Sequence, residues 1–394
     1  MSLAGKRIEA LASADLQALI DDAVSESREI EFKERVGTND EAKREFLADV
    51  SSFANAGGGD LLVGIRERKG IATSFTDLTA IEADDEILRL ESIIRDGLDP
   101  RIPGVSTRAV PTPDEDAVVL VIRVPRSFAA PHMVTFRNLA RFYTRNSAGK
   151  YQLDVSELRT AFSFADSVRT SLRNFRLERL ARITANDGPV ALLPNPKTVL
   201  HLIPMTAIDP SAQVDSASLA QPSVQGFQPI YTGSGWNRRV NFDGALAFSP
   251  SRDGESASYT QIFRNGAIEA VEAFMLRREY LEREHLIPST AFERAVIEAV
   301  GLYLGLMRSI SLTTPYVLGL SLLDVRGLRM GVKSGFFEED HEIDRDDLIV
   351  PEILIEDDSI APATIIRPAI DAIWQATGWP GSTNYDENGT WQDR

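Results

Sequence analysis

Three consecutive glycines, residues 57–59, stand between a helical pattern and an apolar strand, and they constrain the fold of the first third of the chain. Before them, apolar residues from Phe46 to Phe53 recur at helical spacing, which predicts a helix over 40–56 that stops at the glycines. The segment DLLVGIRE after them predicts a short buried strand. Upstream, REIEFKE alternates apolar and charged residues, which predicts a half-buried strand over 28–34.

The same kinds of pattern predict the rest of the architecture. The chain has 394 residues, more than one average domain holds, so at least two domains are expected. We predict an α+β protein: an α/β domain over 1–165, a basic connecting helix over 166–190, and a second mixed α+β domain over 191–394. The Ser-, Gly- and Pro-rich stretch 207–256 predicts long loops, and residues 380–394 are expected to fray.

Composition excludes several classes of site and location. The chain contains no cysteine, which rules out disulfides, thiol catalysis and cysteine-bound zinc. The glycine run lacks both the P-loop ending and the dinucleotide-binding pattern, so we expect no NAD, and we expect no haem. No apolar run is long enough to span a membrane, and the N-terminus turns acidic where a signal peptide would be apolar. A cytoplasmic protein without membrane association is expected.

Charge is distributed unevenly along this acidic chain, whose net charge is −16. Residues 338–358 are strongly acidic, whereas residues 123–150 contain six basic residues and no Asp or Glu. Cations interleaved with aromatic rings suit phosphate contacts and base stacking. In a strand, Phe142 would point into the core and its two neighbours outward. The segment therefore predicts a nucleic-acid interface of Arg123, Arg126, Arg137, Arg141, Tyr143, Arg145 and Lys150.

Three glutamates at the predicted strands are candidates for a metal site. Glu26 and Glu31 flank the start of the first strand, Lys33 follows on the same strand, and Glu67 comes just after the apolar strand. If the two strands pair, the three carboxylates would form an oxygen-rich site suited to Mg²⁺ or Mn²⁺, which can activate water for attack on a phosphate. Lys33 would orient that water or stabilise the developing charge. Strand alternation on an exposed face also explains these charges.

Four segments together resemble the Schlafen AlbA-type domain, once called a divergent AAA domain. They are ESREIEFKE, FLADVSSFANAGGGDLLVGI, VPRSFAAPHMV and RFYTRNSAGK, and the resemblance covers about residues 12–165. It implies a small α/β unit that binds nucleic acid, and in some members a metal-dependent endoribonuclease that cuts transfer RNA-like substrates. The acids of those members fall at Glu26, Glu31 and Glu67 of this chain, although the third is Asp in the animal nucleases.

The resemblance and the residues leave more than one function open. The animal nucleases form a clamp from two such lobes, and this chain contains one, so a clamp would require a homodimer. The leading hypothesis is a protein that binds nucleic acid, RNA rather than duplex DNA, with metal-dependent cleavage at the glutamates. The alternative is a non-catalytic nucleic-acid- or nucleotide-binding regulator whose C-terminal domain senses a ligand or partner. A third option is an assembly component in which 338–358 masks the basic surface.

Overall fold

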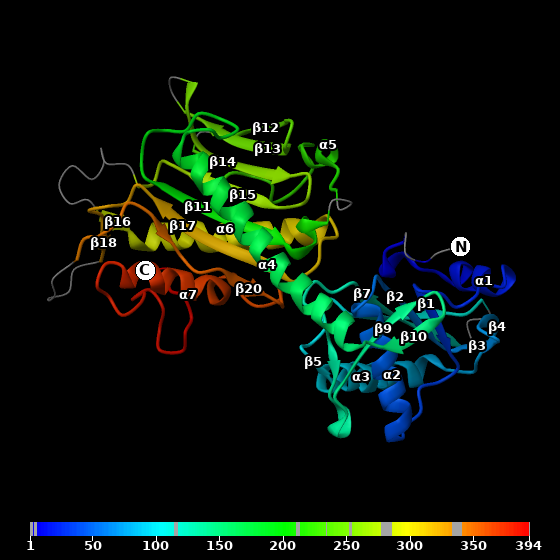
Figure 1. The fold of residues 1–394 in the computed structure, drawn as a ribbon. Coiled ribbons are helices and arrows are strands. Elements are labelled where there is room, and N and C mark those ends of the chain that lie inside the picture. Colours follow the sequence, from blue (N-terminus) through cyan, green and yellow to red (C-terminus); the bar gives the residue numbers. More distant parts are fainter. Residues whose placement is uncertain are drawn as a thin grey trace. The chain divides into compact units, whose positions relative to one another are not determined.

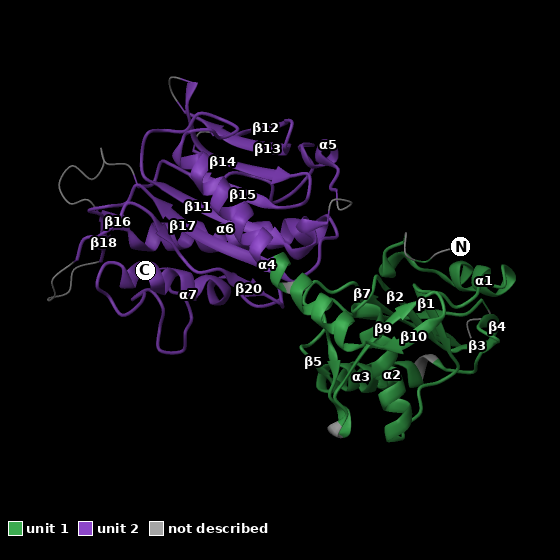
Figure 2. Cartoon of the chain, viewed as in Figure 1, with its two compact units in different colours: residues 1–168 green, residues 169–394 purple. Residues whose placement is uncertain are grey.

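The protein divides into two compact units, Met1–Val168 and Arg169–Arg394 (Figure 2). The computed structural model describes residues 3, 6–113, 117–209, 213–233, 235–251, 254–276, 286–332 and 341–393. Both units mix helices with strands, which confirms the predicted α+β class. The boundary after Val168 falls inside one long helix, α4 (Val155–Thr184). The predicted connecting helix over 166–190 is therefore part of a longer helix that begins at Val155.

Unit 1 is built on a four-stranded sheet in the order β1-β2-β7-β6, in which β1 runs parallel to β2 and the other pairs are antiparallel. A second sheet, β10-β9-β8-β5, and the hairpin β3-β4 lie beside it (Figure 1). The helices are α1 (Ser13–Asp21), α2 (Asp40–Ala54), α3 (Ala80–Gly97) and the first part of α4, with short 3-10 turns η2 (Ile8–Ala10) and η3 (Phe136–Asn138). The strands are β1 (Ile30–Lys33), β2 (Gly58–Val63), β3 (Ile65–Arg68), β4 (Ile71–Phe75), β5 (Leu98–Asp99), β6 (Ser106–Pro111), β7 (Val118–Pro125), β8 (Met133–Val134), β9 (Arg141–Asn146) and β10 (Gly149–Gln152).

The alternation of side chains along the central strands fills two cores, one on each face of the first sheet. Leu61 and Ile122 pack with Phe46 and other residues of α2 and α3 on one face. Leu62 and Val121 pack with residues of α1 on the other face. Because both faces are covered, β2 and β7 read as nearly continuous apolar runs in the sequence.

Unit 2 contains an eight-stranded antiparallel sheet whose main path is β12-β13-β14-β15-β11-β17-β19, with β20 also paired to β17. A short parallel pair joins β16 to β18. The helices here are the rest of α4, α5 (Ser216–Leu219), α6 (Ser289–Ser309) and α7 (Pro362–Gln375), with a 3-10 turn η4 (Met205–Ile208). The strands are β11 (Lys197–Pro204), β12 (Asn237–Val240), β13 (Gly244–Pro250), β14 (Ser256–Phe263), β15 (Ile268–Glu272), β16 (Leu286–Pro288), β17 (Tyr316–Leu323), β18 (Arg329–Gly331), β19 (Leu348–Ile349) and β20 (Ile353–Ile355).

Helices cover both faces of the large sheet. The apolar sides of α6 and α7 form the main core on one face, and Leu180 and Ile183 of α4 pack on the other. Arginine side chains of α4 also enter this layer: Arg179 makes a two-pronged ion pair with the buried Glu269, both N–O distances being 2.9 Å. Part of the arginine-rich face of α4 is thus internal to unit 2.

One sequence prediction for unit 2 holds only in part and another is wrong. Within 207–256, the described residues between α5 and β12 carry no helix or strand, as expected of a long loop, whereas residues 237–250 form the hairpin β12-β13, since short alternating segments extend the sheet. The C-terminal residues up to 393 do not fray, because Trp391 donates a hydrogen bond of 2.8 Å to the buried Glu293 and Tyr385 is itself buried. Of the acidic segment 338–358, residues 338–340 lie outside the described residues.

Candidate functional site

The first strand of unit 1 places one acid and one base on the same side of the sheet. Ile30 and Phe32 of β1 are buried in the core beneath α1, so Glu31 and Lys33 project from the opposite side. Both side chains are half-buried, and the Lys33 ammonium lies 3.9 Å from a carboxylate oxygen of Glu31. The strand pairing therefore brings the two charged residues of the EFK motif together.

The glycine run lets α2 pack closely on this strand pair. A Cβ atom at Gly59 would lie 2.3 Å from the ring of Phe53, so any larger residue would push the ring away. Asn55, at the end of α2, then ties the second sheet to the helix. Its amide donates to the carbonyls of His132 and Tyr143 at 2.9 and 2.8 Å and accepts from the N–H of His132. These motif residues thus fix the backbone that surrounds the charged site.

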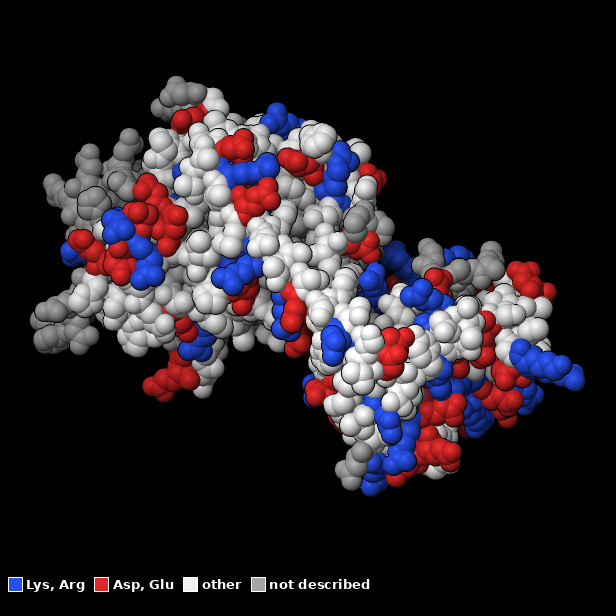
Figure 3. Space-filling view, viewed as in Figure 1, with Lys and Arg blue, Asp and Glu red and all other residues white. Residues whose placement is uncertain are grey.

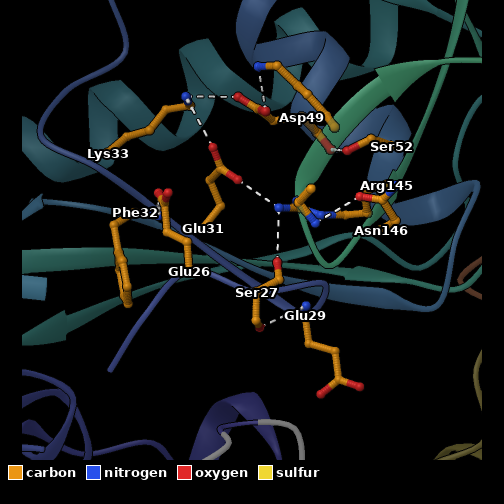
Figure 4. Close-up of polar contacts among 12 residues, drawn as sticks. Glu26, Ser27, Glu29, Glu31, Phe32, Lys33, Asp49, Ser52, Arg145 and Asn146 are labelled. Carbon is orange, nitrogen blue, oxygen red and sulfur yellow. Dashed lines mark hydrogen bonds and ion pairs between the residues drawn. The ribbon is translucent and has the colours of Figure 1, made fainter. Parts of the chain in front are cut away.

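Arg145 of β9 is the cation most deeply buried at the site. Its side chain is 1% exposed and donates to Glu31 at 2.7 Å and to the carbonyl of Ser27 at 3.1 Å (Figure 4). The guanidinium lies over the ring of Phe53, 3.8 Å from the centroid. The RFYTR segment is therefore connected to β1 through a buried ion pair supported by an aromatic ring.

Asp49 of α2 is a site residue that the sequence reasoning missed. Its side chain is fully buried, and its carboxylate forms ion pairs with the ammonium groups of Lys33, at 2.8 Å, and of Lys150 on β10, at 2.6 Å. The carboxylate of Glu45, one turn earlier on α2, lies 3.6 Å from both ammonium groups. Burial opposes the charge on Lys33, but the carboxylates of Asp49 and its neighbours raise the pKa of Lys33. Lys33 therefore stays protonated and acts as a cation at this site, not as a base.

Glu26 and Glu67 meet at the turn of the β3-β4 hairpin. The backbone N–H of Glu26 donates to the carbonyl of Gly70, and the backbone N–H of Gly70 donates to the Glu67 carboxylate. The Glu26 carboxylate accepts from the N–H of Phe32 at 3.1 Å. Its partial burial, together with the charges of Glu31 and Glu67, raises the pKa of Glu26. The three predicted glutamates are thus close enough for their charges to repel.

The three glutamates, as placed, do not form a metal-ligand set. Glu31 is engaged by Arg145 and Lys33, and each of the other two carboxylates accepts a backbone N–H. Within the described parts of the chain, no three Asp, Glu or His side chains are arranged to hold a metal ion. The Mg²⁺ or Mn²⁺ site at these glutamates therefore stays a prediction.

The residues of the predicted nucleic-acid interface do not form one basic groove. Arg123 makes a two-pronged ion pair with Asp60, at 2.7 and 2.9 Å, and Arg126 lies over the rings of Phe128 and Phe164. Basic and acidic side chains alternate over the face of unit 1 seen in Figure 3. Arg145 and Lys150 belong to the buried network described above, which leaves three exposed arginines of the set, Arg126, Arg137 and Arg141.

Two of the exposed arginines, Arg137 and Arg141, have weak partners. Arg137 lies 3.4 Å from the Asp40 carboxylate, and Arg141 donates to Gln152 at 3.2 Å. The expected orientation of the neighbouring rings is wrong. Tyr143 packs against the core beneath α2, whereas Phe142 makes an edge-to-face contact with Phe162 of α4. The reason is that α2 covers the side of β9 that carries Tyr143 and Arg145, while α4 covers the side that carries Phe142.

Comparison with known proteins identifies the N-terminal part of the chain. Residues 26–154 match the family model described as Schlafen, AlbA_2, which confirms the resemblance seen in the sequence. Among solved structures, the DIP2311 protein from Corynebacterium diphtheriae is similar, with 23% identity and a TM-score of 0.25. That match covers 36% of this chain and 26% of the other. A comparison with curated proteins gives no match.

The family match supports a nucleic-acid-related function for unit 1. It begins at Glu26 and ends near the start of α4, so the whole charged network lies within the matched residues. Helices of the described chain are all too short or too polar to cross a membrane.

Proposed function

We propose that unit 1 binds nucleic acid, with structured RNA preferred over duplex DNA. The observation that carries this proposal is the match of residues 26–154 to the Schlafen, AlbA_2 family. RNA is the expected ligand because the nucleases that this unit resembles cut transfer RNA-like substrates. The exposed guanidinium groups of Arg137 and Arg141 supply cations that a phosphate backbone requires.

Binding is tested with the full chain and a fluorescently labelled structured RNA, followed by anisotropy at several salt concentrations. Replacing both Arg137 and Arg141 with Ala should weaken binding by roughly tenfold and flatten the salt dependence, since each lost phosphate contact reduces the slope. The control replaces Arg95 and Arg101, two exposed arginines at and after the end of α3, and removes the same charge. Equal losses in the two double variants, or no RNA binding by the wild type, would refute the proposal.

A more specific proposal is that unit 1 also cleaves the bound RNA in a metal-dependent reaction. The observation in its favour is that Glu26 and Glu67 meet at Gly70 while Glu31 lies on β1, so that three carboxylates gather where a bound cation would neutralise them. The test incubates the full chain with structured RNA and Mn²⁺ and compares the wild type with Glu67→Gln. Glu67 is exposed, so its loss should abolish cleavage while RNA binding and folding persist. Cleavage that survives this change, or no cleavage in any divalent cation, counts against the nuclease.

Binding without cleavage would support the alternative, a non-catalytic regulator. The observation that favours it is a cavity of about 930 Å³ in unit 2, bordered by α5 and by Gly301, Leu302 and Gly305 of α6. A cavity of this size can hold a small ligand. Gly305 has open space beside it, so a leucine there would fill the cavity. If unit 2 senses a ligand, Gly305→Leu should change how a cell extract of small metabolites affects RNA binding. An unchanged response would remove the ligand-sensing role.

A homodimer would supply the second lobe that a clamp requires. Sedimentation velocity of the full chain, with and without RNA, tests this proposal. A monomer in both conditions, with RNA bound at one copy per chain, would show that a single lobe suffices.

A further inference from the structure

Two lysine ammonium groups converge on one exposed carboxylate at the edge of the charged network. Lys33 of β1 and Lys150 of β10 both lie 3.6 Å from the same oxygen of Glu45. Beneath them, the buried Asp49 fixes the ammonium of Lys33 through an ion pair of 2.8 Å (Figure 4) and that of Lys150 through one of 2.6 Å. The lysines are therefore held in place by Asp49, whether or not Glu45 is present.

The two carboxylates at the lysines differ in how firmly they are held. Asp49 is fully buried, whereas the Glu45 side chain is 59% exposed and lies beyond direct hydrogen-bond distance of either ammonium. An exposed ion pair of this kind contributes little to stability. The positive charges of Lys33 and Lys150 lower the pKa of Glu45, which keeps it anionic. Glu45 is thus a weakly held anion placed above a rigid pair of cations.

Without Glu45, the charged groups at this point carry one net positive charge, which a single monoanion can balance. Glu31 is matched by Arg145, and Asp49 neutralises one of the two lysines. One positive charge remains, and the Glu45 carboxylate balances it. A phosphodiester also carries a single negative charge, and it can accept from two ammonium groups at once.

There is room for such a group beside Lys33. A hollow of about 190 Å³ is lined by Lys33, Arg35, Glu45, Phe46 and Glu67, among others. Lys33 lines this hollow together with a second cation, Arg35, whose partner Asp77 is exposed. Glu67, one of the three glutamates, borders the same hollow as Lys33 and Glu45.

We propose that Glu45 occupies the place of a backbone phosphate, and that a phosphodiester of bound RNA displaces Glu45 and sits between Lys33 and Lys150. This inference rests on the proposed function, and it names the subsite at which the RNA backbone meets the glutamates. Glu45 acts there as an internal competitor. Its carboxylate swings into solvent when the phosphate enters, which its exposure permits.

The test compares two isosteric changes on α2. Glu45→Gln removes the competing charge, and Glu41→Gln removes the same charge one turn earlier, at an exposed position. In the anisotropy assay, Glu45→Gln should tighten RNA binding by up to about fivefold, the factor that corresponds to a surface ion pair of at most about 1 kcal/mol. Glu41→Gln should change affinity much less. In a Lys150→Met background the gain from Glu45→Gln should shrink, because one of the two cations is gone.

Failure of the subsite and failure of RNA binding give different results. If the wild type binds RNA and the two glutamine variants behave alike, the subsite is wrong and the proposed function stands. If no variant binds RNA, the Glu45→Gln protein is titrated with inorganic phosphate and followed by NMR. Shifts at residues 33 and 150, absent in Lys150→Met, would support an anion site without RNA; no shifts would overturn the subsite as well.

Discussion

Replacing Arg145 tests whether the buried ion pair holds unit 1 together. The Arg145 side chain is 1% exposed, its partner Glu31 is 17% exposed, and the two are 2.7 Å apart. Removing one member of a buried pair typically costs about 3–5 kcal/mol, because the remaining charge loses its partner. In Arg145→Met, Glu31 keeps Lys33 at 3.9 Å and some contact with water. The methionine also retains a contact with Phe53. We therefore expect a loss near the lower limit, about 3 kcal/mol of the free energy of unfolding.

Replacing Glu31 with Gln should lower the free energy of unfolding by at least as much. The change leaves the Arg145 guanidinium buried without its carboxylate partner, although it still donates to the Ser27 carbonyl. The double variant removes both charges. Its cost should fall below the sum of the single costs by at least about 1.5 kcal/mol, within the range measured for directly contacting residues.

Urea unfolding of the full chain, followed by far-UV circular dichroism, measures this cycle. With a urea dependence of about 1–3 kcal/mol/M, a 3 kcal/mol loss shifts the midpoint by about 1 M or more. Tryptophan fluorescence serves as the internal control, because all four tryptophans (Trp236, Trp374, Trp379 and Trp391) lie in unit 2. Additive single costs, or a loss below about 1 kcal/mol in Arg145→Met, would show that the pair does not stabilise unit 1.

Two further predictions concern Glu26 and Glu293. Partial burial raises the pKa of Glu26 in the folded chain, so its ionisation opposes folding above that pKa and has no effect at pH values well below 4.5. Glu26→Gln should therefore increase the free energy of unfolding at pH 7 by less than about 1 kcal/mol, given solvent screening, and the gain should vanish near pH 3. Thermal unfolding at the two pH values measures this, and a gain independent of pH contradicts it. Glu293→Gln turns an amide N–H₂ towards the indole donors of Trp374 or Trp391, which lie 2.7 and 2.8 Å from the carboxylate. The change should lower the free energy of unfolding by about 1–3 kcal/mol and alter the tryptophan emission spectrum. An unaltered spectrum would argue against the two indole hydrogen bonds to Glu293.

The sequence was sufficient for the elements whose side-chain pattern is governed by burial. The helix predicted over 40–56 is found as α2, and the strand predicted over 28–34 contains β1. The helix and the strand each alternate apolar and polar residues with their own period, so each pattern can be recognised from the local sequence alone. The hairpin β12-β13 was missed because its strands are short and depend on pairing with β14, a contact that no local pattern reports.

The candidate site was predictable only in part. Glu31 and Lys33 could be placed together because they share one face of one strand. Asp49 was missed although a signal existed: it is an acid within the apolar run of α2, where a buried carboxylate requires cations. Arg145 was expected at the surface, because a local pattern cannot show that β9 packs beside α2 and directs this side chain under Glu31.

The residues of the charged site and its surroundings fall into two groups, and the fold explains only one of them. Gly59 and Asn55 are explained by packing and backbone hydrogen bonds, and Arg145 by its buried ion pair, so their presence follows from the fold alone. Folding does not explain why Glu26 lies where burial and neighbouring charges disfavour its ionisation, nor why two lysines share an exposed carboxylate. Unfavourable charge placement such as that of Glu26 is typical of functional sites. Variants of these exposed or half-buried groups, which leave the scaffold intact, are therefore the ones that can separate binding from cleavage.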